Sequence, residues 1–192
     1  SQMKNAVRIF AALSFVFGTW LSIIATRDLH IAITFGFIGL GLLAIYAAIT
    51  YTVGKRAYGY YGLGDLSVLI FFGIVGVVGS YFLQAKELEW LIFLPAGSVG
   101  LLAMGVLNLN NMRDIETDKL HGKNTLASML GLKGAKIYQG FLIIIAFDMA
   151  YIYNVFTDAS GWANLYFLSV PFLAMNLISV SRAQTSADFE PL

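Results

Sequence analysis

The chain has 192 residues, of which 58% are hydrophobic and only 12% are charged. Soluble domains carry about 25% charged residues, so this composition, with a mean hydropathy of +0.75, excludes an ordinary soluble domain and indicates a polytopic membrane protein. The absence of cysteine excludes disulfide and thiolate chemistry, and two histidines, His30 and His121, make a zinc site unexpected. No nucleic-acid partner is expected.

Six segments are long and apolar enough to cross a bilayer core about 30 Å thick, which takes roughly 20 helical residues. They are residues 6–25, 31–53, 66–84, 90–109, 136–156 and 162–181. The sequence therefore predicts an all-α fold, a bundle of transmembrane helices. In the third helix Gly73, Gly76 and Gly79 predict close contact with a neighbouring helix, and Pro171 predicts a kink within the sixth.

Positive charges are distributed unequally between the two sides of the predicted bundle. One side, opposite the start of the chain, holds only Arg27 and Lys86. Because basic residues accumulate on the cytoplasmic side, the other side is predicted to face the cytoplasm, in the cell (inner) membrane. Its basic residues are Lys4, Arg8, Lys55, Arg56, Arg113, Lys119, Lys123, Lys133, Lys136 and Arg182.

The most polar stretch, residues 108–126 (NLNNMRDIETDKLHGKNTL), lies on this side between the fourth and fifth helices. Asp114 and Asp118 are four residues apart and Asn111 precedes the first by three, so a continuing helix places all three on one face. Such oxygen donors suit Mg²⁺, which takes one or two carboxylates together with phosphate oxygens and water. The alternative is a group of solvated charges at a helix end.

Basic residues stand beside these carboxylates, notably Arg113, Lys119 and Lys123. Cations that contact phosphate oxygens, next to carboxylates that hold a metal, are what a diphosphate site needs. Gly122 is expected to end the helix and to turn Lys123 back toward the carboxylates. The alternative is that the lysines only follow the positive-inside rule.

The stretch NNMRDIETDKLHGKNTL and the loop YTVGKRAYGYYGLGD (residues 51–65) together resemble the UbiA superfamily of intramembrane prenyltransferases. The likeness is close over roughly residues 51–132 and general in the flanking helices. It implies a nine-helix bundle, Mg²⁺ and a polyprenyl diphosphate held between two Asp-rich motifs, and a lateral opening to the lipid bilayer. Matched by position, Asn111, Asp114 and Asp118 would form the second motif, with Arg113 and Lys123 as diphosphate contacts.

The superfamily's first Asp-rich motif, NDxxD, has no counterpart in this sequence. The resemblance therefore implies that residues 1–192 are one prenyltransferase domain truncated at both ends, and the fragment alone is expected to be inactive. Within the superfamily the two loops are most similar to members that prenylate 1,4-dihydroxy-2-naphthoate, with loss of diphosphate and CO₂, to give demethylmenaquinone. The alternatives are another aromatic acid acceptor, 4-hydroxybenzoate or homogentisate, and, from a different class, a membrane transporter.

The tyrosine-rich loop offers further candidates. Four tyrosines, Tyr51, Tyr58, Tyr60 and Tyr61, either present their rings to an allylic cation or form an interfacial aromatic belt. Tyr60 is predicted to be catalytic with the two aspartates. Lys55 and Arg56 either bind substrate or anchor the loop to anionic lipid. Asp65 is either the N-cap of the third helix or a cavity carboxylate, and Asp148 is expected to be hydrogen-bonded inside the bundle.

Overall fold

A computed structural model describes residues 2–54 and 57–189, and all regular structure within these residues is helical. Six helical spans are long and apolar enough to cross a membrane, so the all-α prediction is confirmed. Three spans are built from more than one element. The elements are α1 (Gln2–Ala25), α2 (Ile31–Thr52), η1 (Tyr58–Tyr61), α3 (Gly64–Val68), the π-helix η2 (Leu69–Val78), α4 (Gly79–Ala85), η3 (Trp90–Ile92), α5 (Phe93–Arg113), α6 (Ile115–Leu120), α7 (Leu126–Phe156), η4 (Gly161–Ser169), α8 (Val170–Arg182) and η5 (Ser186–Phe189).

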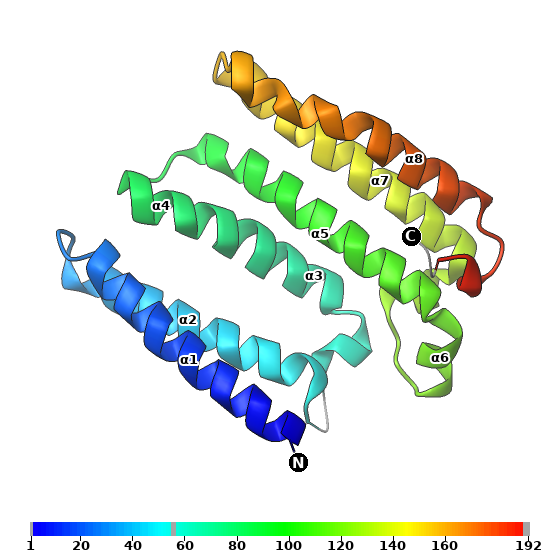
Figure 1. The fold of residues 1–192 in the computed structure, drawn as a ribbon, viewed down its shortest axis with the longest axis horizontal. Helices are drawn as coiled ribbons and strands as arrows, with labels where there is room; N and C mark the ends of the chain where they lie inside the picture. The colour runs from blue at the N-terminus through cyan, green and yellow to red at the C-terminus, as the bar shows by residue number, and fades with distance from the viewer. Residues whose placement is uncertain (1, 55–56, 190–192) are drawn as a thin grey trace.

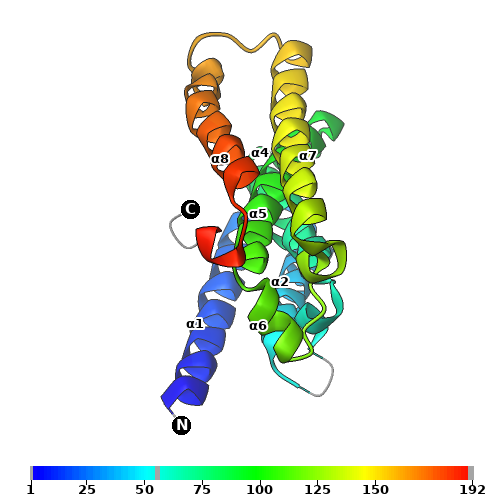
Figure 2. The same ribbon diagram turned by 90° about the vertical axis from the view of Figure 1, so that its right-hand side faces the viewer.

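The helices lie side by side in chain order, with the α1–α2 hairpin at one edge, α5 near the middle and α7–α8 at the other edge (Figure 1). The start of α1, η1, α6 and the segment after α8 lie at one end of the molecule (Figure 1). A second view also places the start of α1 and α6 at the same end (Figure 2). The fold thus gathers the polar loops at one end of the bundle.

Two spans extend beyond their predicted limits on either side of the polar stretch 108–126. α5 continues four residues beyond the predicted end, to Arg113, because two of the added residues, Asn111 and Met112, are buried. α7 begins at Leu126, where the Thr125 hydroxyl caps it by accepting a hydrogen bond from the Ser128 amide at 3.2 Å. Gly131, the sixth residue of α7, interrupts the helix with φ of 69°. The fifth span therefore starts ten residues before its predicted start at residue 136.

The predicted glycine contact in the third span is formed by one glycine of the three. A Cβ on Gly73 would lie 2.6 Å from the carbonyl oxygen of Ala96 and 2.9 Å from Cα of Gly100, so the third span and α5 touch backbone to backbone there. Gly76 meets only its own helix within 4 Å, and Gly79 only the ring of Phe37. The three-residue spacing rotates away from α5, because Leu69–Val78 is a π-helix with i→i+5 hydrogen bonds, and a three-residue step falls well short of one of its wider turns.

The prediction that Pro171 kinks a continuous helix is wrong, because this residue lies at the start of a helix. The sixth span runs as the 3₁₀ segment η4 to Ser169 and becomes the α-helix α8 at Val170, which places Pro171 in the first turn. The first turn tolerates proline because its amides have no intrahelical acceptor.

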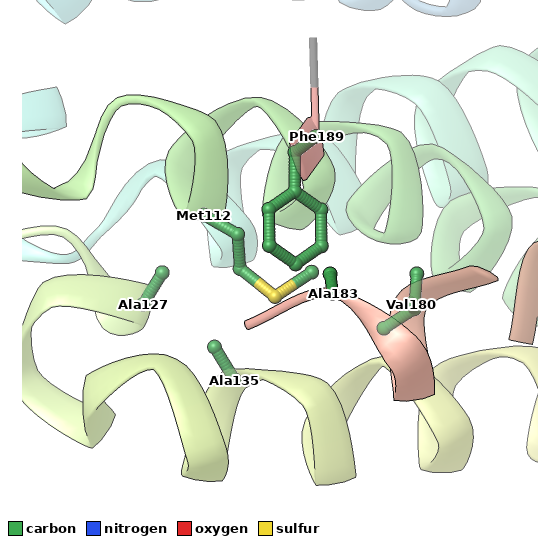
Figure 3. Packing of buried hydrophobic residues seen from close by; sticks show 6 residues of the cluster. All are labelled: Met112, Ala127, Ala135, Val180, Ala183 and Phe189. Atoms are coloured by element: carbon green, nitrogen blue, oxygen red, sulfur yellow. The ribbon is translucent and has the colours of Figure 1, made fainter. Parts of the chain in front are cut away.

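A small apolar cluster forms where the residues after α8 pack against α5 and α7 (Figure 3). The ring of Phe189, only 4% exposed, packs on the fully buried Met112 near the end of α5. Lys136 donates hydrogen bonds to the carbonyls of Ser181 and Ala183, so α7 also holds the chain leaving α8. The cluster comprises Met112, Ala127, Ala135, Val180, Ala183 and Phe189.

Candidate active site

The two predicted metal-binding aspartates lie at a break in the fourth helix. α5 ends at Arg113, Asp114 has φ of −92° and ψ of 7°, and α6 begins at Ile115. The Asp118 amide still donates to the Asp114 carbonyl at 2.8 Å, so the two residues are one helical turn apart. Asn111 and Asp118 are buried, whereas the Asp114 side chain is 40% exposed.

Each aspartate forms an ion pair with a basic residue predicted to contact diphosphate. Arg113 donates to both carboxylate oxygens of Asp114, at 2.8 and 3.1 Å. Its hydrogen bond holds the pKa of Asp114 below the usual range, against a smaller opposing effect of burial. Lys123 Nζ donates to both oxygens of Asp118, at 3.1 and 3.0 Å. The site therefore contains alternating positive and negative groups.

The turn after α6 brings Lys123 to Asp118. Gly122 adopts the left-handed conformation, with φ of 67°. The amide of Lys123 donates to the Asp118 carbonyl at 2.8 Å and that of Gly122 to the Lys119 carbonyl at 3.1 Å, the bonding pattern of a Schellman motif. The predicted helix end at Gly122 is confirmed, and the lysine folds back as expected.

A polar pocket of about 280 Å³ joins this turn to the tyrosine loop. The Asn124 amide donates to the Tyr60 carbonyl at 2.9 Å, which fixes the two loops to each other. Tyr60, Asp118 and Lys123, predicted from separate stretches, meet in this pocket, while Asn111, Arg113 and Asp114 do not line it. Lys55 and Arg56 lie outside the described residues. The lining residues are Tyr51, Thr52, Gly59, Tyr60, Asp118, His121 and Lys123.

Tyr51, one of the four tyrosines that could face an allylic cation, also lines the pocket from the last turn of α2. Its ring packs edge to face on Tyr58, with centroids 5.4 Å apart. The Tyr58 hydroxyl donates to the Ala47 carbonyl at 2.9 Å and also contacts Ser67 Oγ at 2.9 Å. These two tyrosines are therefore packed between helices, whereas Tyr61 is 59% exposed.

An apolar cavity of about 510 Å³ adjoins the polar pocket, between α2 and the third span. Tyr51 lines both spaces, so the two meet at its side chain. A polar pocket beside an apolar cavity suits a molecule with a charged head and a hydrocarbon chain. The cavity is lined by Ala44, Ala47, Ala48, Tyr51, Tyr58, Ser67, Val68, Phe71, Phe72 and Val75.

The structure supports neither interpretation of Asp65, which is no N-cap and lines neither the polar pocket nor the apolar cavity, and it contradicts the prediction for Asp148. Asp65 makes no N-cap, because α3 starts at Gly64 with Leu63 as its cap; it is instead buried and accepts a hydrogen bond from the Tyr138 hydroxyl of α7 at 3.2 Å. The prediction for Asp148 is wrong: this side chain is exposed on α7 and has no hydrogen-bond partner within the described residues.

The oxygen donors of the helix break suit Mg²⁺ only as part of a shared site. No group of three or more histidine, cysteine or acidic side chains that could hold a metal occurs within residues 2–54 and 57–189. A protein that binds Mg²⁺ together with diphosphate and water, however, contributes only a few oxygen ligands. Here these ligands would be two carboxylates and the side-chain amide of Asn111, on consecutive turns. The donor set therefore fits Mg²⁺ bound together with a diphosphate.

Six spanning helices, with a charged pocket at the end where the polar loops gather, define a polytopic integral membrane protein whose candidate active site lies at the membrane margin. The family model described as the UbiA prenyltransferase family matches residues 3–189. The chain belongs to this family, which confirms the resemblance seen in its two loops and gives no support to the transporter alternative.

Curated relatives agree with this assignment. The chain is 44% identical over 192 residues to the 1,4-dihydroxy-2-naphthoate octaprenyltransferase of Haemophilus influenzae and 42% identical over 191 residues to that of Escherichia coli. Each match covers 100% of this chain and 61% of the relative, so the chain spans about three fifths of their length. The enzyme of the same name from Bacillus subtilis is 36% identical over 137 residues, 69% of this chain and 42% of its own. No solved structure matches significantly.

Proposed function

We propose that the complete protein transfers a polyprenyl group from polyprenyl diphosphate to 1,4-dihydroxy-2-naphthoate, with loss of diphosphate and CO₂, to form the ring skeleton of demethylmenaquinone. The observation that carries this proposal is the pocket in which Tyr60, Asp118 and Lys123 meet beside an apolar cavity. The names of the relatives supply the acceptor. The basic end of the bundle would face the cytoplasm of the cell (inner) membrane.

The charged groups of the helix break would hold the diphosphate. Asp114, Asp118 and Asn111 would hold Mg²⁺, which neutralises charge that develops on the leaving diphosphate. Lys123 and Arg113, now paired with the two aspartates, would exchange these partners for diphosphate oxygens when the substrate arrives. Each cation thereby gains charge-assisted hydrogen bonds to phosphate in place of those it gives up.

The tyrosines would act where the hydrocarbon part begins. As the bond between the allylic carbon and the diphosphate oxygen lengthens, positive charge develops on the prenyl chain. The rings of Tyr51, which lines both spaces, and Tyr60, which lines the polar pocket, would stabilise this charge. The adjoining apolar cavity would take the chain and exclude water, which otherwise traps the cation.

We further propose that the whole enzyme completes the metal site with ligands from outside residues 1–192. The NDxxD motif of the superfamily would lie in the part of the relatives' length that this chain does not span. Residues 1–192 would then be one part of a single transmembrane domain, and would not catalyse the transfer alone.

The test uses the full-length protein in membrane vesicles with labelled polyprenyl diphosphate. Asp114→Asn and Asp118→Asn are each expected to lower transfer to 1,4-dihydroxy-2-naphthoate by at least about 100-fold, because an electrostatic contact made in the transition state is lost. Glu116→Gln, an exposed neighbour in the same helix, is the matched control and should stay active. Wild-type activity in Asp118→Asn, or a preference for 4-hydroxybenzoate or homogentisate, would contradict the proposal.

A further inference from the structure

Asp65 is a buried carboxylate that the proposed handling of diphosphate does not use. Its residue is 6% exposed, at the start of the third membrane span. The only side-chain donor to it within the described residues is the neutral hydroxyl of Tyr138, at 3.2 Å. No described basic side chain forms an ion pair with it, since the ion pairs of these residues involve Asp28, Asp114 and Asp118.

A carboxylate in this setting is costly for stability alone. Burying an ionised group without a charged partner costs several kcal/mol even after relaxation, on the order given for single ions. One neutral hydrogen bond returns only about 1.5–3 kcal/mol. A hydrophobic residue would join α3 to α7 at lower cost, so the position of Asp65 points to a use in the reaction.

Asp65 directly follows a residue that contacts the tyrosine shared by the two spaces, although Asp65 itself lines neither of them. The hydroxyl of Tyr51 lies 3.0 Å from the position of a Cβ built on Gly64, the residue before Asp65. The same tyrosine lines the polar pocket with Asp118 and Lys123, and lines the apolar cavity. Tyr51 therefore lies between Asp118, on the diphosphate side, and Asp65. An acceptor ring bound against Tyr51 and Gly64 would be next to the residue that carries this carboxylate.

We propose that Asp65 is the base that takes the proton of an acceptor ring hydroxyl during prenyl transfer. The proposal rests on the function proposed above. The allylic C–O bond breaks with its electron pair leaving on diphosphate, while the ring carbon that bears the carboxylate forms the new C–C bond. The neighbouring hydroxyl loses its proton to Asp65, and the O–H electron pair becomes part of a carbonyl group.

The second half of the step returns the proton. The bond from the ring to the carboxylate breaks, CO₂ leaves, and the electron pair restores the aromatic ring. The carbonyl oxygen then takes the proton back from Asp65, so the residue ends as it began and no oxidant or further reactant is needed. The Tyr138 hydroxyl would orient the carboxylate for both transfers.

Two variants in the full-length enzyme separate this role from a structural one. Asp65→Asn keeps an oxygen that accepts the Tyr138 hydrogen bond but removes the base, and is expected to lower kcat by at least about 100-fold. Tyr138→Phe removes the same hydrogen bond but keeps the base, and is expected to cost less than about tenfold. If the pair only joined α3 to α7, Tyr138→Phe would be the more damaging change.

The readouts are kcat, the KM for each substrate, and the melting temperature in detergent. The KM for polyprenyl diphosphate should stay within about threefold in both variants, and Asp65→Glu should recover part of the activity. Asp148→Asn, the exposed aspartate of α7, is the matched control and should behave as wild type. Equal losses of kcat in Asp65→Asn and Tyr138→Phe, or a fully active Asp65→Asn, would overturn the role of Asp65 as the base but not the proposed function. A wild-type enzyme that does not prenylate the naphthoate would overturn the proposed function as well.

Discussion

Replacement of Gly122 by alanine tests how Lys123 reaches Asp118. Gly122 has φ of 67°, and a Cβ built on it meets nothing within 4 Å. The substitution therefore introduces backbone strain without a steric clash. The Schellman hydrogen bond from the Lys123 amide to the Asp118 carbonyl depends on this left-handed residue.

The expected size of the effect follows from the left-handed conformation. A residue with a Cβ pays about 1–2 kcal/mol there, which is a factor of about 5–30 in an equilibrium. If the turn relaxes to relieve the strain, the population with Lys123 against Asp118 falls by at most this factor. The apparent affinity for the prenyl diphosphate should fall by no more than the same factor.

The assay is the apparent KM for polyprenyl diphosphate in the full-length enzyme, with Gly122→Asn as the matched control. Asparagine adopts the left-handed conformation far more readily than alanine does, so it should keep most of the affinity. Equal values of KM for the alanine and asparagine variants would refute the reasoning. So would a loss much greater than about 30-fold, since backbone strain alone cannot account for it.

Three further changes have defined outcomes. Gly73→Ala should lower the melting temperature in detergent, because its Cβ would lie 2.6 Å from the Ala96 carbonyl and overpacking costs about 1–3 kcal/mol; Gly79→Ala, with 3.8 Å of space in the same span, should not. Phe189→Ala should destabilise the protein by about 3–5 kcal/mol through the cavity left beside Met112, measured by chemical unfolding. Arg113→Gln should raise the pKa of Asp114 toward the ordinary value of an aspartate, observed by carboxyl NMR. Since the pKa of Asp114 is depressed in the folded wild-type protein, the ion pair stabilises the fold fully at pH values above the ordinary aspartate pKa. This stabilisation is lost as the pH falls through the lower pKa of the folded state. An unchanged titration of Asp114 in the variant would contradict this reasoning.

The membrane spans were predictable because length and hydropathy alone define them. Their internal details were not. The π-helical conformation of Leu69–Val78 and the 3₁₀ conformation of Gly161–Ser169 leave no mark on hydropathy. The predicted kink at Pro171 depended on the assumption that the sixth span is one uniform α-helix. The buried position of Phe189 depends on residues far back along the chain.

The candidate site was predictable where local spacing sets the geometry. The single turn between Asp114 and Asp118 and the reversal at Gly122 both follow from neighbouring residues. The sequence did not show that Tyr51 lines the pocket, or that Tyr138 reaches Asp65, because both contacts join separate helices. Asp148 was misjudged for the same reason: which face of α7 it occupies depends on the helices around it.

The packing of Phe189 on Met112 has a consequence for biogenesis. Helices are synthesised and inserted from the N-terminus onward, so α5 is in place well before the residues after α8 exist. Met112 stays uncovered until α8 has been inserted and the chain has folded back over it. The helix break that carries Asp114 is therefore among the last parts of this chain to reach its final packing, although it lies near the middle of the sequence.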